Sequence, residues 1–362
     1  MTKRTLLGLF LSGLAACSDA VGPDQPEGTL LAAGSLALEW SADGREIFYY
    51  DSGYTTARVT PLPDRILAVN VMTRATRVVV ASGAYGSGGA ARPGIPPRVT
   101  IAGLAYLRTD GDQFALRLVT GTSDVAVVAC GPWFTTTPDR SRLLYSPPIY
   151  EPFDDSIGVI DLVTGARTSV PTGPYHPTSS TAVSPDGNQI VLERFDASAG
   201  FGILDLRDST ITVLPDSLFP GPLQDFPPIL LGWNAEGVWF VEGGGPPHLI
   251  RYHPASGAAH WFPISHATGG AGDGTGGTAP PTGGTIVWSH NCNSDDPLSG
   301  RCLSSAYAVW LMNPLTGVDD RLVDFYAGPD LDFPRAFFAA VSPDGQSLAY
   351  VLGNDLRLLT LR

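Results

Sequence analysis

One turn pattern recurs along this chain and constrains its fold more than any other feature. Val183-Ser184-Pro185-Asp186-Gly187 is repeated at Val341–Gly345, and a short apolar segment follows each copy. In this pattern Pro presets φ at the second position of a type I turn, and Gly completes the turn. Weaker copies stand at Trp40–Gly44, Thr137–Arg140, Trp233–Gly237 and Pro281–Gly284. A unit of short strands repeated about every 47 residues predicts a β-propeller.

A second series of turns joins pairs of apolar segments. Its members are Asn70–Arg74, Leu118–Gly121, Asp161–Gly165, Asp205–Ser209, His253–Gly257 and Asn313–Gly317. Asp or Asn can bond its own backbone here, and Gly accepts a positive φ. The two series interleave, so each repeat reads strand A, first turn, strand B, loop, strand C, second turn, strand D. We predict an all-β propeller over residues 29–362, with seven blades of four antiparallel strands favoured and six or eight left open.

The two ends of the repeat region predict how the ring closes. The last copy starts at Phe337 and lacks a fourth strand, whereas the apolar segment Thr29–Ala33 has no assigned place. We therefore expect this N-terminal strand to complete the last blade, which would hide an open sheet edge. Blade 2 is the weakest copy, with Val99–Ile101 where its first turn should be.

The motifs resemble those of a known family. Ser-Pro-Asp-Gly-x-x-Ile/Leu, followed by an Asp-Leu-x-Thr-Gly hairpin, resembles the WD40-like propeller repeat of TolB-type periplasmic proteins. The copies at 182–193 and 340–351 match closely, whereas Arg140, Glu236 and Thr282 depart from the pattern. The resemblance implies a propeller of the cell envelope that binds or scaffolds proteins, and it implies no fixed catalytic residues.

The N-terminus has the pattern of a processing signal. Lys3 and Arg4 precede the apolar run Leu6–Leu14, which is shorter than the roughly 20 residues of a membrane-spanning helix. Leu14-Ala15-Ala16-Cys17 resembles the bacterial lipobox, which implies cleavage before Cys17 and fatty acylation of that residue. We expect residues 1–16 to be a signal peptide and residues 17–28 a lipidated tether; the alternative is an ordinary signal peptide with a stray cysteine. The resemblance implies, with Ser18 after the cysteine, an outer-membrane lipoprotein that faces the periplasm or the cell surface.

The charge balance excludes several classes of function. The chain has 22 basic and 35 acidic residues and a net charge of −13. Lys3 is the only lysine, so the mature chain lacks the amine needed for Schiff-base or P-loop chemistry. An acidic chain also argues against nucleic-acid binding, which uses basic patches. We expect a monomer whose partner is an envelope protein or a glycan.

The cysteines after Cys17 predict one disulfide. Cys292 and Cys302 flank a turn-rich segment, in a compartment where disulfides persist. A metal site with His290 and Asp295 is the alternative, although zinc-type spacing is missing. Cys130 ends a strand-like run and is expected to be a buried, small apolar residue.

The candidate binding face is the one that carries the loops after strands B and D, because most of the long insertions fall there. The insertions mix acids with aromatic residues, which suit a sugar, a peptide or a cationic partner. The candidate residues are Tyr150, Glu151, Phe153, Asp154, Tyr175, His176, Asp225, Phe226, Asp295, Asp296, Asp330, Asp332 and Phe333. In the alternative interpretation, the aromatic residues pack the loops onto the blades and the acids cap turns.

Enzymatic motifs are weak. The sequence has no Gly-x-Ser-x-Gly elbow, and its paired acids match no calcium-loop pattern. We therefore expect no catalytic residues, no cofactor and no metal, with a structural Ca²⁺ left open. Two alternatives to a binding module stay open: a lactonase-like or lyase-like enzyme with Ca²⁺ near Asp225 and Asp332, and a purely structural surface lipoprotein.

Overall fold

The computed structural model describes most of the region of the repeats. The described residues are 28–33, 35–51, 65–84, 95–110, 113–148, 155–178, 181–194, 200–219, 228–241, 248–263, 277–279, 286–292, 306–312, 319–326, 338–352 and 355–361. Among these residues no helix is long and apolar enough to cross a membrane, and η2 (Asp216–Leu218) is a single 3-10 turn.

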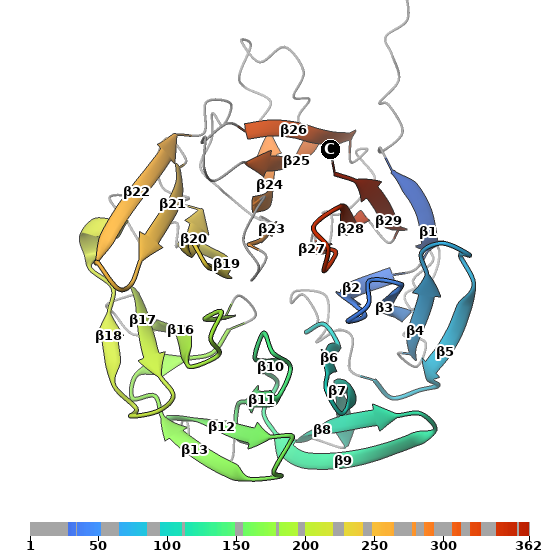
Figure 1. Cartoon of the computed structure of the whole chain (residues 1–362), viewed down its shortest axis with the longest axis horizontal. Coiled ribbons are helices and arrows are strands. Elements are labelled where there is room, and N and C mark those ends of the chain that lie inside the picture. Colours follow the sequence, from blue (N-terminus) through green and yellow to red (C-terminus); the bar gives the residue numbers. More distant parts are fainter. Residues whose placement is uncertain are drawn as a thin grey trace, which may run out of the picture.

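The described strands form seven antiparallel sheets arranged around a common axis (Figure 1). In every sheet except the one that joins the two ends of the chain, the first strand lies at the inner edge of the ring and the last at the rim. Blade 1 consists of β2 (Ser35–Trp40), β3 (Glu46–Asp51), β4 (Arg65–Asn70) and β5 (Thr76–Val80). Blade 2 consists of β6 (Arg98–Thr100), β7 (Gly103–Asp110), β8 (Gln113–Thr120) and β9 (Ser123–Cys130). Blade 3 consists of β10 (Phe134–Thr136), β11 (Arg142–Tyr145), β12 (Ser156–Asp161) and β13 (Arg167–Pro171). The predicted all-β propeller of four-stranded antiparallel blades is confirmed.

The remaining sheets follow the same plan, with one extra strand in blade 4. There β14 and β15 both pair with β16 on its inner side. Blade 4 consists of β14 (Tyr175–His176), β15 (Ala182–Val183), β16 (Gln189–Arg194), β17 (Gly200–Asp205) and β18 (Ile211–Val213). Blade 5 consists of β19 (Ile229–Asn234), β20 (Gly237–Val241), β21 (His248–His253) and β22 (Ala258–Pro263). Blade 6 is β23 (Gly277–Thr278), β24 (Ile286–Cys292), β25 (Ala306–Met312) and β26 (Asp319–Tyr326).

Blade 7 contains both ends of the repeat region. It consists of β27 (Phe338–Val341), β28 (Ser347–Leu352), β29 (Asp355–Thr360) and the N-terminal strand β1 (Thr29–Ala33). Thr29 pairs with Leu358 and Ala33 with Asp355 in an antiparallel register. The N-terminal segment expected to close the ring therefore does so.

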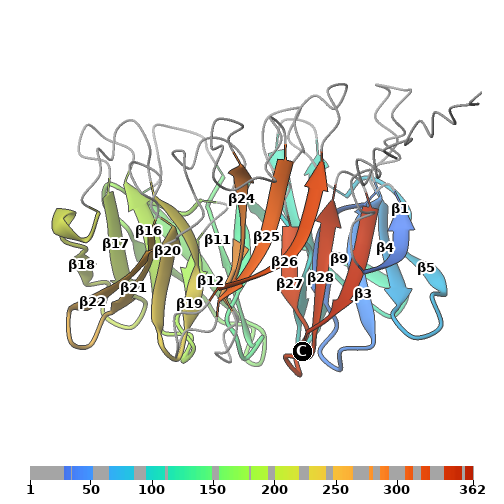
Figure 2. The same ribbon diagram turned by 90° about the horizontal axis from the view of Figure 1, so that it is seen from above.

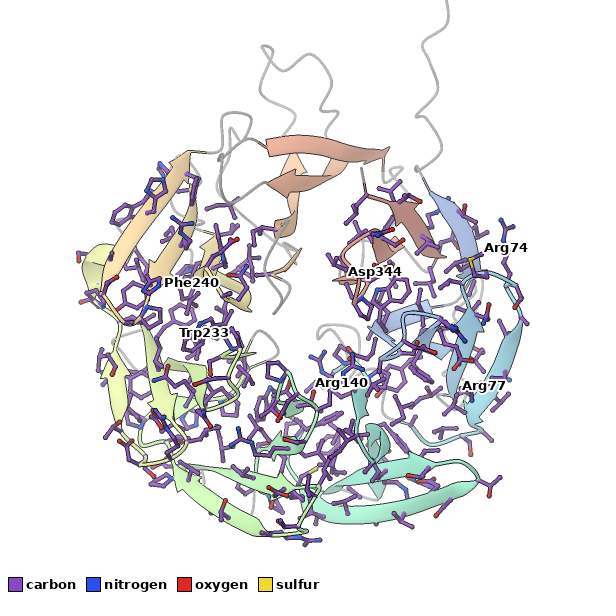
Figure 3. All side chains as sticks on the ribbon, in the orientation of Figure 1. Arg74, Arg77, Arg140, Trp233, Phe240 and Asp344 are labelled. Carbon is purple, nitrogen blue, oxygen red and sulfur yellow. The ribbon has the colours of Figure 1, made fainter. Side chains whose placement is uncertain are left out.

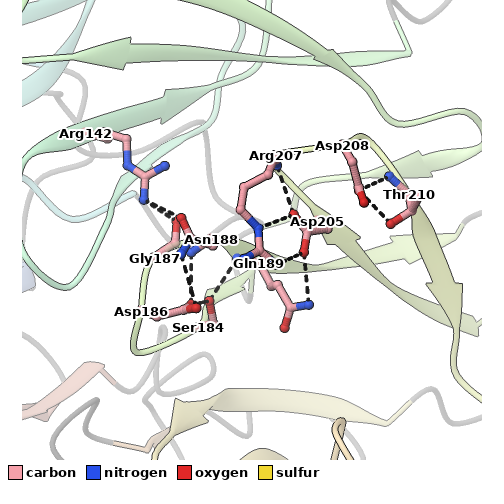
Figure 4. Close-up of polar contacts among 10 residues, drawn as sticks. All are labelled: Arg142, Ser184, Asp186, Gly187, Asn188, Gln189, Asp205, Arg207, Asp208 and Thr210. Carbon is pink, nitrogen blue, oxygen red and sulfur yellow. Dashed lines mark hydrogen bonds and ion pairs between the residues drawn. The ribbon is translucent and has the colours of Figure 1, made fainter.

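The recurring turns form because their own side chains satisfy the backbone. In blade 4 the hydroxyl of Ser184 donates to the carboxylate of Asp186 at 2.6 Å and accepts the N–H of Gln189 at 2.8 Å (Figure 4). Gly187 adopts φ +72°, which favours glycine. Ser41 with Asp43 and Ser342 with Asp344 repeat this arrangement. We call the face that carries these turns the turn face and the opposite one the loop face; Figure 2 shows the ring from the side.

The hydrophobic core is divided among the interfaces between blades. Leu38 and Trp40 of blade 1 pack with Ala349 and Val351 of blade 7, for example. Similar clusters join blades 1 and 2, 2 and 3, 3 and 4, 4 and 5, and 5 and 6. Middle strands such as β20 are buried on both faces, whereas rim strands such as β13 are largely exposed. The packed interfaces make each blade a rigid support for the residues at the inner edge of the ring.

Candidate functional site

Most of the predicted binding residues lie outside the described residues. These are Tyr150, Glu151, Phe153, Asp154, Asp225, Phe226, Asp295, Asp296, Asp330, Asp332 and Phe333. Cys17 and Cys302 lie outside as well, and Cys292 is described only as the last residue of β24. The lipidation, the disulfide and most of the binding face therefore stay predictions.

Tyr175 is one of the two predicted binding residues that the structure describes, and it belongs to the core. Its side chain is only 4% exposed and packs in the cluster between blades 3 and 4. The ring lies against Gly202, where an added Cβ would come within 2.9 Å of its Cε1 atom. The interpretation of Tyr175 as an exposed contact for a partner is therefore wrong. The alternative, in which the aromatic residue packs its segment onto the blade, describes this position.

His176 is half-buried beside Tyr175 and lies among polar side chains at the loop face. In β14 it pairs with Glu193, while Tyr175 pairs with Arg194 at the end of β16. The guanidinium carbon of Arg194 lies 6.0 Å from the centroid of the Tyr175 ring, within the range of a cation–π contact. These strands occupy the inner side of blade 4.

The carboxyl group of Glu193 has an unusual environment at this position. Burial raises its pKa, and a hydrogen bond with Thr178 acts in the opposite direction. The backbone N–H of Thr178 donates to Oγ1 of Thr181 at 2.7 Å, which holds this segment next to β16. We call His176, Thr178, Glu193 and Arg194 the blade 4 platform; all four side chains are partly exposed.

A second group of charges lies at the inner edge near the turn face and was not predicted from the sequence. Nη1 of Arg98 in β6 donates to Oε2 of Glu39 in β2 at 3.2 Å, so the pair joins blades 2 and 1. Arg140, in the first turn of blade 3, lies close enough to act electrostatically on the same carboxylate. We call Glu39, Arg98 and Arg140 the inner-edge cluster; Figure 3 shows Arg140 on the inner side of the ring.

Burial dominates the ionisation of Glu39. It raises the pKa of the carboxyl group, although Arg98, Arg140 and the N–H of Val99 all favour the charged form. The one sequence signal for this cluster was that Arg140 departs from the turn pattern. Arg140 has φ +63° at the position where Gly187 has φ +72°, and a residue with a Cβ pays roughly 1 kcal/mol for this conformation.

The described residues contain no group of three or more His, Cys, Asp or Glu side chains that could hold a metal ion. Asp225 and Asp332, on which the calcium-dependent alternative depends, are outside these residues. Cys130 is 2% exposed, and burial raises the pKa of its thiol to about 12. It is therefore the buried apolar residue that was expected and is unsuited to act as a nucleophile.

Comparisons with known proteins support the fold and no more. No protein-family model matches the chain, and neither does any curated protein. An oligogalacturonate lyase in complex with manganese is similar with a TM-score of 0.60 and 11% identity, covering 94% of this chain and 95% of that one. An oligogalacturonate lyase from Vibrio parahaemolyticus has a TM-score of 0.60 and 7% identity, covering 94% of each chain.

Solved structures similar to this chain also include TolB from Acinetobacter baumannii, as the repeat motif led us to expect. The identity is 17%, over 90% of this chain and 78% of that one, with a TM-score of 0.46. This likeness is too low to support an inference about function. The two lyases show the propeller fold alone.

Proposed function

We propose that this chain is a lipid-anchored propeller of the bacterial cell envelope that binds a protein or a glycan through its loop face. The observation that carries the proposal is the blade 4 platform. Four partly exposed polar residues lie at the loop-face end of β14 and β16. Arg194 lies over the buried ring of Tyr175, and Glu193 shares a hydrogen bond with Thr178. Because two of them are on β16 and one on β14, packed strands hold them in place, as a binding site requires.

The chemistry of the platform suits a neutral, hydroxyl-rich or amide-rich ligand. Arg194 supplies several N–H donors, and His176 and Thr178 can both donate and accept. Glu193 accepts hydrogen bonds when charged and can also donate one when protonated, and burial raises its pKa. Sugar hydroxyls and peptide groups present the matching donors and acceptors.

The N-terminal sequence supports the membrane anchor. Leu14-Ala15-Ala16-Cys17 has the lipobox pattern, and the described propeller begins at Gly28. A tether of residues 17–28 spans at most about 40 Å when fully extended. The ring would thus stay close to its membrane while the loop face reaches partners there. Incorporation of labelled palmitate tests the anchor, and a Cys17→Ala variant should incorporate none.

The binding proposal is tested by crosslinking in intact envelopes, followed by identification of the captured partner and measurement of its affinity. Glu193→Gln and His176→Ala should each weaken binding at least about tenfold, the loss expected for a hydrogen bond to a charged group. Glu46→Gln is the matched control, because it is also a half-buried glutamate but lies in blade 1, paired with Arg77. Urea unfolding verifies that each variant is folded.

Two further variants extend this test to the predicted loop residues. Phe226→Ala and Phe333→Ala should also reduce partner capture and leave the urea midpoint unchanged. If all four variants bind like the unaltered chain, the loop face is not the binding surface. A stoichiometric metal in the purified protein, together with cleavage of an acidic oligosaccharide, would instead favour the enzyme alternative.

A further inference from the structure

The inner-edge cluster has more positive than negative charge. Arg98 and Arg140 face a single carboxylate, that of Glu39. This carboxylate already accepts the N–H of Val99 and Nη1 of Arg98. The positive charge of Arg140 is therefore not neutralised, because Glu39 already forms an ion pair with Arg98. The excess is local, because the whole chain is acidic, with a net charge of −13.

The acid that precedes Arg140 in the sequence, Asp139, does not compensate for this excess. The carboxylate of Asp139 accepts from Oγ1 of Thr137 at 2.5 Å and from Oγ of Ser141 at 2.6 Å, within its own turn. Within the described part of the chain, the guanidinium of Arg140 makes no hydrogen bond or ion pair. Arg142, two residues after Arg140, instead donates from Nη2 to the backbone carbonyl of Gly187 in blade 4.

Arg98 presents a second unsatisfied group. Its Nε atom is buried and has no hydrogen-bond partner, although buried N–H groups are nearly always paired. The rest of the side chain is still 28% exposed, and that of Glu39 is 18% exposed. A small solute can thus reach the exposed part of the cluster from solvent, although the buried Nε itself becomes accessible only if the Arg98 side chain shifts.

The backbone conformation of Arg140 also indicates a ligand site at this position. The equivalent turn positions in blades 1, 4 and 7 are Gly44, Gly187 and Gly345, with φ of +69°, +72° and +73°. Among the described turns of this series, only that of blade 3 places a long cationic side chain in this left-handed conformation at the inner edge of the ring. Strained residues of this kind are concentrated at sites that bind ligands.

From these observations we propose that the inner-edge cluster is an anion-binding site, at which Arg140 and Arg98 hold an oxyanion of a carboxylate or phosphate group. Guanidinium groups bind both kinds of oxyanion through paired, charge-assisted hydrogen bonds. Glu39 acts as a positioning residue, because its ion pair orients Arg98. The site lies near the turn face, at the other end of the ring from the blade 4 platform, and does not depend on the function proposed above.

The test is a calorimetric titration of the full chain with inorganic phosphate and, separately, with citrate, at low ionic strength. At least one probe should bind, and Arg140→Gly should weaken binding at least about tenfold. The probe that binds more tightly identifies the source of the oxyanion. If neither probe binds, or if Arg140→Gly binds both as the unaltered chain does, the proposal is overturned.

Arg74→Gly is the matched control, because Arg74 also has a positive φ, +59°, but is exposed at the rim of blade 1 (Figure 3). It should bind the probes like the unaltered chain; an equal loss in both variants would show a non-specific charge effect and contradict the proposal. Glycine suits both backbone positions, so neither variant should lower the urea midpoint. Arg140→Lys, which keeps the charge and loses the fork of donors, should bind more weakly than the unaltered chain.

Discussion

The indole Nε1 of Trp40 donates a hydrogen bond of 2.9 Å to the backbone carbonyl of Ala340, 300 residues further along the chain. Trp40 ends the innermost strand of blade 1, and Ala340 lies in the innermost strand of blade 7. This bond therefore joins the first and last blades at the inner edge of the ring. At the rim, β1 pairs with β29 and completes the sheet of blade 7. The ring is closed twice, once by backbone pairing and once by a side chain.

The inner closure predicts the effect of removing one donor. Trp40→Phe keeps most of the buried ring but leaves the carbonyl of Ala340 without this partner, and should lower the free energy of unfolding by at least about 1 kcal/mol. Urea unfolding measures the change. Trp261→Phe is the control, because Trp261 is 40% exposed and its Nε1 donates at 3.3 Å to Leu218 within neighbouring blades. A larger loss for Trp261→Phe would contradict the importance of this closure.

The outer closure predicts a contrast between two adjacent leucines in β1. Leu31 is 9% exposed and packs in the core between blades 7 and 1, whereas Leu30 is 46% exposed. Leu31→Ala should lower the free energy of unfolding by about 2–4 kcal/mol, and Leu30→Ala by less than about 0.5 kcal/mol. Thermal or urea unfolding of the two variants distinguishes them. Equal effects would mean that β1 does not contribute to the core as described.

The turn carboxylates predict loss of stability in acid. The hydrogen bond from Ser184 and the N–H of Asn188 hold the pKa of Asp186 below its usual value, although burial opposes them. Similar bonds lower the pKa of Asp43, Asp139 and Asp344. Since the unfolded pKa is about 3.9, these groups favour the folded state above about pH 4, and this stabilisation is lost as the pH falls through the folded pKa.

The experiment compares urea midpoints of the unaltered chain and Asp186→Asn between pH 7 and pH 2.5. The variant should be less stable than the unaltered chain at pH 7, and the difference should shrink toward the acid end. A difference that stays constant across this range would show that the charge of Asp186 does not stabilise the turn.

The buried thiol of Cys130 predicts a simple count of reactive cysteines. With a pKa of about 12 and 2% exposure, Cys130 should not react with a thiol reagent in the native protein at pH 8. In a Cys17→Ala variant unfolded without reductant, one thiol should react if Cys292 and Cys302 are bonded. Adding a reductant should raise the count to three. Three reactive thiols before reduction would rule out the predicted disulfide.

The local features of this protein could be predicted from sequence, because their contacts are between near neighbours. Ser184 and Asp186 are two residues apart, and their bond forms the turn whatever the rest of the chain does. Because these turns join neighbouring strands, their interleaved order along the sequence also predicted the order of strands within a blade. The place of Thr29–Ala33 followed from the missing strand of the last blade, since an unpaired edge is unfavourable.

The chemistry at the inner edge depends on which side chains the closed ring brings together. Glu39 and Arg98 are 59 residues apart and meet only because two rigid blades lie side by side. Tyr175 was a plausible binding residue by type, yet the space above Gly202 admits its ring and buries it. Side-chain direction alternates along a strand, so burial depends on register and on the neighbouring blade as much as on residue type. Composition and turns therefore predict the propeller, while the packing of its blades selects the side chains that can meet a ligand.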